Sequence, residues 1–203
     1  MIEIIRMDPK IINLPEGAAA GRLGFKGRMD IPDEFRDLYG TSMDRIRETA
    51  DPMALIGEFN AGSDPPRIED QEIPGNLAEK HLGGSDTVSI LLVTIGSGID
   101  DLIDSEERGG NTLSSFFLDG LASELVEFAV RKLDSDLRKK FQNRSGGARI
   151  SPGYGDLPLE LNEWILNILS GSRIGVSCVE TSYQLVPRKT VAALIGWRDR
   201  VEE

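Results

Sequence analysis

The stretch Val88-Ser89-Ile90-Leu91-Leu92-Val93-Thr94-Ile95 decides the fold, because it is the longest strongly apolar run in the sequence and is rich in β-branched residues. It ends at a turn-forming segment, Gly96-Ser97-Gly98. We therefore expect a central β-strand here. The run is also too short to cross a bilayer as a helix.

The sequence after this strand has both helical and strand-like patterns. Ile99, Leu102 and Ile103 indicate one or two helical turns, and Asn111 or Thr112 can cap a long helix that runs to about Gln142. A second helix is expected from Pro158 to Leu169, ended by Gly171. The remaining segments are rich in β-formers and predict strands: Arg173 to Val179, Ser182 to Val186 and Val191 to Trp197.

The sequence before the central strand is less regular. Short β-like pieces at Ile2 to Ile5 and Ile11 to Leu14 precede a helix that starts at Asp30 to Glu34, with Phe35, Leu38, Met43 and Ile46 on its buried side. A strand from Met53 to Phe59 leads into a loop-rich stretch, Asn60 to Asp86, with a short helix near Leu77 to Leu82. There is no regular βαβ alternation. We therefore expect one α+β domain over residues 1–203, with a twisted, largely antiparallel sheet, flanking helices and one long central helix.

Composition limits the possible functions. Thirty-four acidic residues against 23 basic ones give a net charge of −11, which disfavours nucleic acid and anionic membranes as partners. One cysteine, Cys178, and one histidine, His81, leave no cluster for zinc or iron. Residues 1–6 lack the features of a secretory signal, so we expect a soluble, cytoplasmic protein.

Common catalytic motifs do not fit this chain. Gly96-Ser97-Gly98 suggests a dinucleotide-binding turn, but the third glycine position is Asp101, whose carboxylate would repel a pyrophosphate. We interpret it as a tight turn from strand to helix. His81 is expected at the surface, and Cys178, within an apolar run, as an inert buried thiol.

The long helix carries a polar line beside its apolar side. At 100° per residue, Glu124, Arg131 and Arg138 fall opposite the apolar side and are expected to face solvent. Asp119, Ser123 and Glu127 are spaced by four residues and form a line near the apolar edge. Two interpretations of Asp119 stay open: a bond to a nearby loop amide, or a carboxylate for a cationic ligand group.

The segment Arg149-Ile150-Ser151-Pro152-Gly153-Tyr154 is the candidate ligand site. Pro152 forces Ser151 into extended geometry, and Gly153 permits a positive φ or a close approach of the backbone. We expect an extended connection between two helices that exposes backbone groups to the edge of a purine. Arg149 offers a fork for a carboxylate, and Tyr154 offers a ring and a hydroxyl. The alternative is a structural loop anchored by Tyr154.

This segment resembles a known family. Arg149, Gly153 and Tyr154 match the R-x-x-x-G-Y signature of the S-adenosylmethionine-binding activation domain of cobalamin-dependent methionine synthase. The long helix, the loop, the helix from Pro158 and the Leu185–Val191 segment follow in that family's order. The resemblance covers about residues 88–197 and is closer to small stand-alone relatives; residues 1–87 match only loosely.

The resemblance implies a reactivation subunit. S-adenosylmethionine remethylates a partner's cobalamin that has slipped to the Co(II) state, with an electron from a flavodoxin-like donor, on the cobalamin-binding module of a corrinoid methyltransferase. Any methyltransferase activity would exist only in complex with that corrinoid protein, and no catalytic residue comes from this chain. By position, Glu127 would meet the ligand's ammonium group, Arg149 its carboxylate, and Ser151, Gly153 and Tyr154 its adenosine. Asp119 and Ser123 are possible supporting residues.

The sequence also departs from the family pattern. An acidic ligand residue before the motif arginine is replaced by Gln142-Asn143-Arg144. An acidic ligand residue of the family's N-terminal part and a tyrosine pair beyond its terminal strands have no counterpart here. These departures favour a rival hypothesis, a non-catalytic binding or scaffold protein of the same fold that has lost the ligand site.

Overall fold

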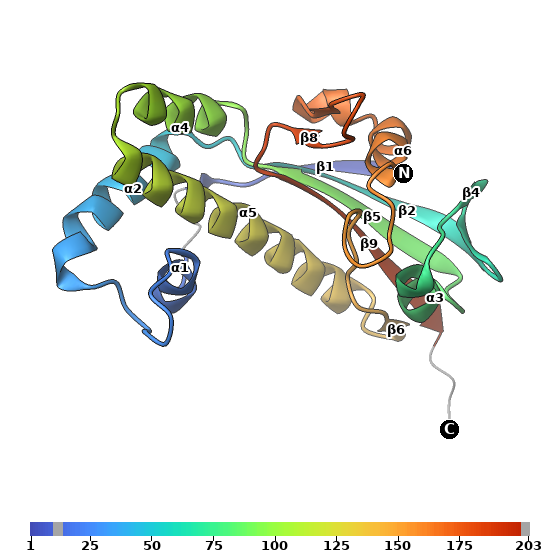
Figure 1. The fold of residues 1–203 in the computed structure, drawn as a ribbon. Helices are drawn as coiled ribbons and strands as arrows, with labels where there is room; N and C mark the ends of the chain where they lie inside the picture. The colour runs from blue at the N-terminus through green and yellow to red at the C-terminus, as the bar shows by residue number, and fades with distance from the viewer. Residues whose placement is uncertain (10–13, 200–203) are drawn as a thin grey trace.

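The protein is built around a seven-stranded sheet in which every pairing is antiparallel (Figure 1). The computed structural model describes residues 1–9 and 14–199. At the centre, β5 (Thr87–Thr94) lies between β2 (Met53–Ser63) and β9 (Thr190–Asp199). The α+β class and the largely antiparallel sheet predicted from the sequence are confirmed.

Shorter strands extend this sheet on both sides. On one side, β1 (Ile2–Arg6) pairs with the first half of β2, and β3 (Pro66–Ile68) pairs with the end of β2 and with β4 (Gln71–Glu72). On the other side, β6 (Arg144–Gly146) pairs with the end of β9. The predicted strand at 11–14 falls almost entirely on residues outside the described part of the chain.

The apolar run of β5 is continuous because both faces of the sheet are buried. Leu91 and Val93 pack in a core with the long helix, whereas Ile90 and Leu92 pack in a second core on the opposite face. Successive side chains of a strand point to opposite faces, so a strand covered on both sides needs apolar residues at consecutive positions. The predicted central strand is therefore confirmed.

The long helix α5 (Thr112–Lys140) spans 29 residues, as the sequence predicted, and lies along one face of the sheet (Figure 1). Three further helices pack on it: α1 (Glu16–Arg22), α2 (Arg36–Thr49) and α4 (Gly98–Arg108). Asn111 occupies the N-cap position without a side-chain capping bond. Because helices cover α5 on the side away from the sheet, Glu124 is only 5% exposed; its predicted place on a solvated face was wrong.

The opposite face carries α3 (Asn76–Leu82) and α6 (Leu161–Leu169), which are the predicted helices at 77–82 and 158–169. The region after α6 differs from the prediction. Instead of a strand over 173–179, the chain forms a 3-10 helix, η3 (Gly171–Ile174), and a small hairpin of β7 (Ser177–Cys178) and β8 (Leu185–Val186). Gly175, with φ 70°, ends η3, so the apolar run is divided between two elements.

Other helices depart from the predicted boundaries. The helix expected from Asp30 begins as a 3-10 turn, η2 (Asp33–Phe35), before α2, and α4 is 11 residues long rather than one or two turns. No pattern in the sequence indicated α1. No helix in the described part of the chain is long and apolar enough to cross a membrane.

Candidate functional site

A groove of about 940 Å³ lies where α5, α3, the start of β9 and the segment between β6 and α6 meet. Its lining includes four of the predicted site residues: Glu127, Arg149, Ser151 and Tyr154. Glu127 comes from α5, and the other three come from the segment that connects β6 to α6. The groove is large enough for a nucleoside-sized ligand.

Arg149 and Glu127 form an ion pair in the wall of this groove. Arg149 Nη2 donates to Glu127 Oε2 at 3.2 Å, and the two side chains are 22% and 26% exposed. The other terminal nitrogen, Nη1, is buried and has no hydrogen-bond partner among the described residues. A buried guanidinium N–H without an acceptor is costly, and an anionic oxygen could satisfy this atom after a shift of the side chain towards the groove.

The backbone of the connecting segment is more regular than the sequence suggested. Ile150 donates to the Leu194 carbonyl at 3.0 Å and accepts from the Leu194 amide at 2.8 Å, so it forms a β-bridge with β9. Gly153 then donates to the Leu157 carbonyl at 2.9 Å within successive turns. The expectation of an extended strip with free backbone groups was therefore wrong for Ile150 and Gly153, because sheet and turn bonds use these groups.

Gly153 and Tyr154 have different relations to the groove. Gly153 has φ 85°, as expected for the position, and a side chain there would collide with Leu159, but Gly153 is not among the lining residues. Tyr154 lines the groove and is 67% exposed. Its ring is therefore not the hydrophobic anchor of a structural loop and remains available to a ligand.

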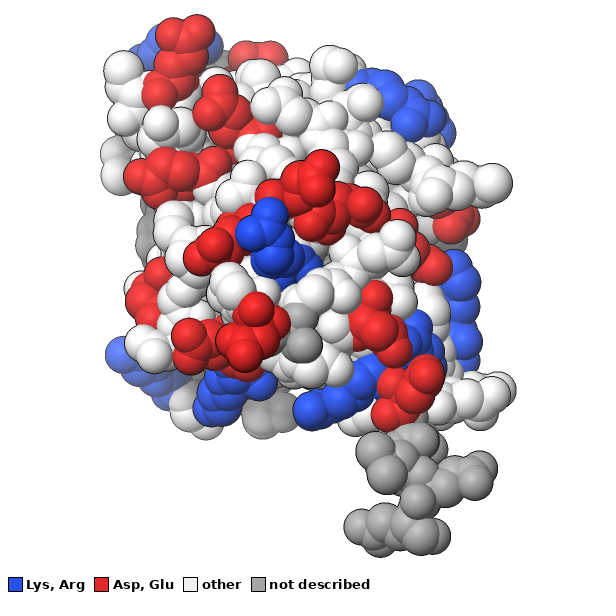
Figure 2. Space-filling view, turned by 90° about the vertical axis from the view of Figure 1, so that its right-hand side faces the viewer, with Lys and Arg blue, Asp and Glu red and all other residues white. Residues whose placement is uncertain are grey.

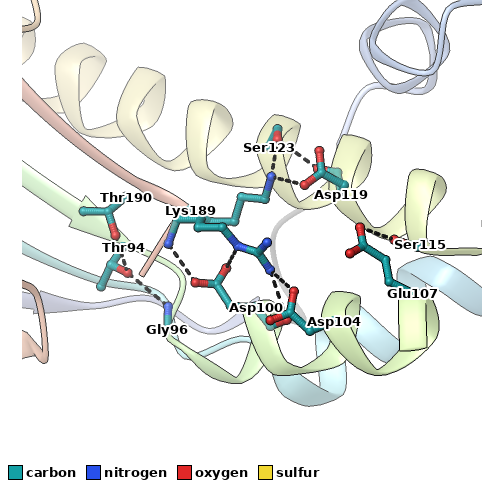
Figure 3. Close-up of polar contacts among 11 residues, drawn as sticks. Thr94, Gly96, Asp100, Asp104, Glu107, Ser115, Asp119, Ser123, Lys189 and Thr190 are labelled. Carbon is teal, nitrogen blue, oxygen red and sulfur yellow. Dashed lines mark hydrogen bonds and ion pairs between the residues drawn. The ribbon is translucent and has the colours of Figure 1, made fainter. Parts of the chain in front are cut away.

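Asp119 and Ser123 do not line the groove but contact Lys189 instead (Figure 3). Lys189, 10% exposed at its side chain, donates from Nζ to Asp119 Oδ1 at 2.6 Å and to Ser123 Oγ at 2.9 Å. The cation that meets Asp119 is thus an ammonium group of the chain itself. This pair fixes the start of β9 on α5.

Arg188, the residue before Lys189, is fixed to α4 in the same way. The Arg188 amide donates to Asp100 Oδ2 at 2.8 Å, and its guanidinium contacts Asp104 Oδ1 at 2.5 Å. Arg188 also lines the groove. Two consecutive cations therefore hold the turn before β9, and with it one wall of the groove, between α4 and α5.

Asp156 fixes the part of the groove that α3 forms. Its carboxylate accepts the amides of Asn76 at 2.6 Å and Leu77 at 3.0 Å, and so caps the N-terminus of α3 from outside the helix. The amide of Leu77, followed by that of Asn76, holds the pKa of Asp156 below its ordinary value. α3 carries Leu77 and His81 into the lining, so this contact ties the connecting segment to α3.

Several groove residues were not predicted as site residues. Arg22 and Arg131 line the groove and pair with Glu124, and His81, expected only at the surface, lines it as well. A helical pattern could not identify Arg22, because its place depends on packing between helices distant in sequence. Only its spacing on α5, one turn after Glu127, could have drawn attention to Arg131.

Other chemistry finds little support at this site. Within residues 1–9 and 14–199, no three His, Cys, Asp or Glu side chains converge as metal ligands. Burial raises the pKa of the Cys178 thiol, and Glu163 and Glu180 raise it further, which disfavours the nucleophilic thiolate.

Comparison with solved structures supports this architecture, whereas comparison with known sequences finds no match. No protein-family model matches the sequence, and no curated protein does. Among solved structures, the chain is similar to the MetH reactivation domain bound to AdoHcy, with a TM-score of 0.75 and 15% identity over 100% of this chain and 80% of that one. At this identity the likeness concerns the fold. The protein has the fold of the methionine synthase reactivation domain.

Proposed function

We propose that this protein binds S-adenosylmethionine in the groove and acts as a cytoplasmic reactivation subunit for a corrinoid methyltransferase. The observation that carries the proposal is the buried, unpartnered Nη1 of Arg149 in the groove wall, next to the carboxylate of Glu127. The fold supports it, because a solved domain of this fold binds AdoHcy, which shares the adenosine and amino-acid groups of S-adenosylmethionine.

The residues present fit the amino-acid end of such a ligand. This end carries a carboxylate and an ammonium group, and Arg149 and Glu127 offer one complementary charge for each. The exposed ring of Tyr154 offers a surface for the adenine. In the proposed complex Arg149 Nη1 gains the acceptor that it lacks, while Glu127 turns one oxygen to the ammonium.

The protein's own contribution would be orientation. Bound S-adenosylmethionine would supply the methyl group and become S-adenosylhomocysteine. Co(II) cobalamin on the partner's binding module would receive the methyl group together with one electron from a flavodoxin-like donor. Arg149 and Glu127 fix one end of the ligand, and the turn held by Arg188 and Lys189 keeps the facing wall in place. Such positioning is the main contribution that a binding domain can make to a transfer between two reactive cofactors.

The alternative is a non-catalytic scaffold of the same fold. One observation favours it: among the described lining residues, Glu127 is the only carboxylate, and it is already paired with Arg149. The family carries a further acid in the region of residues 142–144. Here Arg144 in that region pairs with Asp86 and Asp199, in a contact that joins β6 to the sheet.

Titration calorimetry with S-adenosylmethionine and S-adenosylhomocysteine separates the two. We expect binding, weakened about 10- to 100-fold by Arg149→Gln, since a hydrogen bond to a charged group contributes about 1.5–3 kcal/mol. Arg67→Gln is a matched control, because Arg67 is a half-exposed arginine of β3 outside the groove. Absence of heat with both ligands near about 1 mM would favour the scaffold. Equal affinity in Arg149→Gln would instead contradict the role proposed for Arg149.

The activity needs a separate assay. A Co(II) corrinoid protein, a reductant and S-adenosylmethionine are incubated with and without the chain, and formation of methylcobalamin is followed by its absorbance. We expect methylation only when the chain is present, and less of it with Arg149→Gln. Equal methylation without the chain would contradict the proposed role even if the ligand binds.

A further inference from the structure

A second group of charges lies in the groove, on the side formed by α1 and α5. Glu124, only 7% exposed at its side chain, is contacted by Arg131 Nη2 at 2.5 Å and by Arg22 Nη2 at 3.5 Å. A buried carboxylate needs a cationic partner, and here it has two. The arginine side chains remain 48% and 43% exposed, and both line the groove.

The packing of α1 on α5 places Arg22 at this position. Gly120 lies under the end of α1, where an added Cβ would stand 3.0 Å from Leu23 Cδ2 and 3.6 Å from Arg22 Cγ. The missing side chain lets α1 approach α5 closely. Arg22 therefore reaches the carboxylate of Glu124 one turn further along α5.

The two guanidinium groups carry more positive charge than their partner neutralises. Within the described ranges, Glu124 is the only carboxylate within 4.0 Å of either one. Two arginines and one glutamate leave one positive charge, and the adjacent Glu127–Arg149 pair adds none. Each guanidinium has five N–H donors, of which a single carboxylate can accept only some.

This surplus contrasts with the rest of the molecule. The chain has a net charge of −11, and acidic side chains are spread over the face seen in Figure 2, with basic ones among them and along its edges. Arg188, also in the groove, is matched by two carboxylates, Asp100 and Asp104. Attraction of anions is therefore expected at Arg22 and Arg131, and not over the surface in general.

We propose that Arg22 and Arg131, held by the buried Glu124, form an anion subsite of the groove that takes the phosphate group of a small-molecule ligand. A phosphate offers three oxygens and up to two negative charges, enough to bond both guanidinium forks at once. A carboxylate ligand would offer only two oxygens and one negative charge, which is what Glu124 already provides. The subsite is distinct from Arg149 and does not depend on binding of S-adenosylmethionine.

Nuclear magnetic resonance with inorganic phosphate tests the subsite. His81 is the only histidine of the sequence and lines the same groove, so its ring signals and the backbone amides of α1 and α5 report binding. Phosphate is titrated at constant pH and ionic strength, with acetate in parallel. We expect saturable shifts with phosphate that localise to residues near Arg22 and Arg131, and weaker binding of acetate.

Variants sharpen the test. Arg22→Gln and Arg131→Gln each leave Glu124 one cation, so the fold should persist, and each should weaken phosphate binding by about fivefold or more. Lys139→Gln, the same charge change at an exposed position of α5 beyond the groove, should have no effect. Glu124→Gln frees both guanidinium groups and should tighten binding, a gain that misfolding cannot produce.

Three results would overturn the proposal: no saturable shift with phosphate, equal binding in the arginine variants and in Lys139→Gln, or a folded Glu124→Gln chain that binds no more tightly. Binding of acetate as tight as that of phosphate would overturn the choice of phosphate. None of these results bears on calorimetry with S-adenosylmethionine, so the two proposals fail separately.

Discussion

Replacement of Gly196 by alanine should destabilise the protein and disturb one wall of the groove. Gly196 lies on β9 opposite Val88 of β5, directly beneath the end of α3. A Cβ at this position would stand 2.9 Å from the His81 carbonyl oxygen and 3.2 Å from Leu82 Cα, and it would also meet Ser85 Oγ. The serine hydroxyl can rotate away, but the two backbone atoms move only if α3 moves.

The magnitude follows from this overpacking. Insertion of a methyl group against backbone in a packed interior costs about 1–3 kcal/mol. For a chain of this length, that lowers the melting temperature by roughly 2–12 °C. Because α3 carries Leu77 and His81 into the groove, displacement of α3 should also lower the affinity for any ligand that binds there.

Urea unfolding and calorimetry measure the effect, with Gly62→Ala as the matched control. Gly62 is also a strand glycine of the sheet, but an added Cβ would meet only Arg67 Cβ at 3.8 Å, an ordinary contact. We expect the free energy of unfolding of the control to stay the same or rise slightly. A Gly196→Ala chain within about 0.5 kcal/mol of the parent protein would refute the claim that α3 rests rigidly on β9.

Two further predictions concern the contacts that fix the groove walls. In urea unfolding, Asp119→Ala should destabilise the protein by at least about 1 kcal/mol more than Lys189→Met. The first change leaves a buried ammonium without its carboxylate, whereas the second leaves a half-exposed carboxylate that water can solvate. Equal losses of stability in the two variants would contradict this asymmetry. Asp156→Ala should lower the melting temperature at pH 7, because the ionised carboxylate caps α3. Since the pKa of Asp156 is lowered in the folded protein, this contribution is complete above the ordinary aspartate pKa and is lost as the pH falls through the lowered value. The difference between the parent protein and Asp156→Ala should therefore shrink in acid, and a constant difference down to about pH 2 would show that another interaction causes it.

The candidate site shows how far motif reasoning reaches. Glu127, Arg149, Ser151 and Tyr154 were selected from the sequence and line one groove, whereas Gly153 of the same motif does not. The same reasoning did not find that Ile150 forms a β-bridge with Leu194, because a single apolar residue between polar ones does not indicate which strand it pairs with. The roles of these residues towards S-adenosylmethionine stay predictions.

Periodicity within a single element was the most informative property of the sequence. The apolar run of β5 and the long pattern of α5 each reflect a buried surface that lies within one continuous segment, so both could be predicted without knowledge of the rest. Short segments were harder. The β-formers at 173–179 were divided between η3 and β7, because a turn at Gly175 overrides the propensity of its neighbours.

The sequence by itself determined the α+β class, the central strand and the long helix, because each depends on patterns within continuous segments. Only the tertiary structure decided which polar residues meet. Glu124 fell on a solvated face by its helical angle, yet α1 covers that face and brings Arg22 against it. Asp119 meets Lys189, and Asp156 caps α3, across about 70 or 80 residues of chain. Such pairs depend on how separate elements pack, and no local pattern specifies that packing.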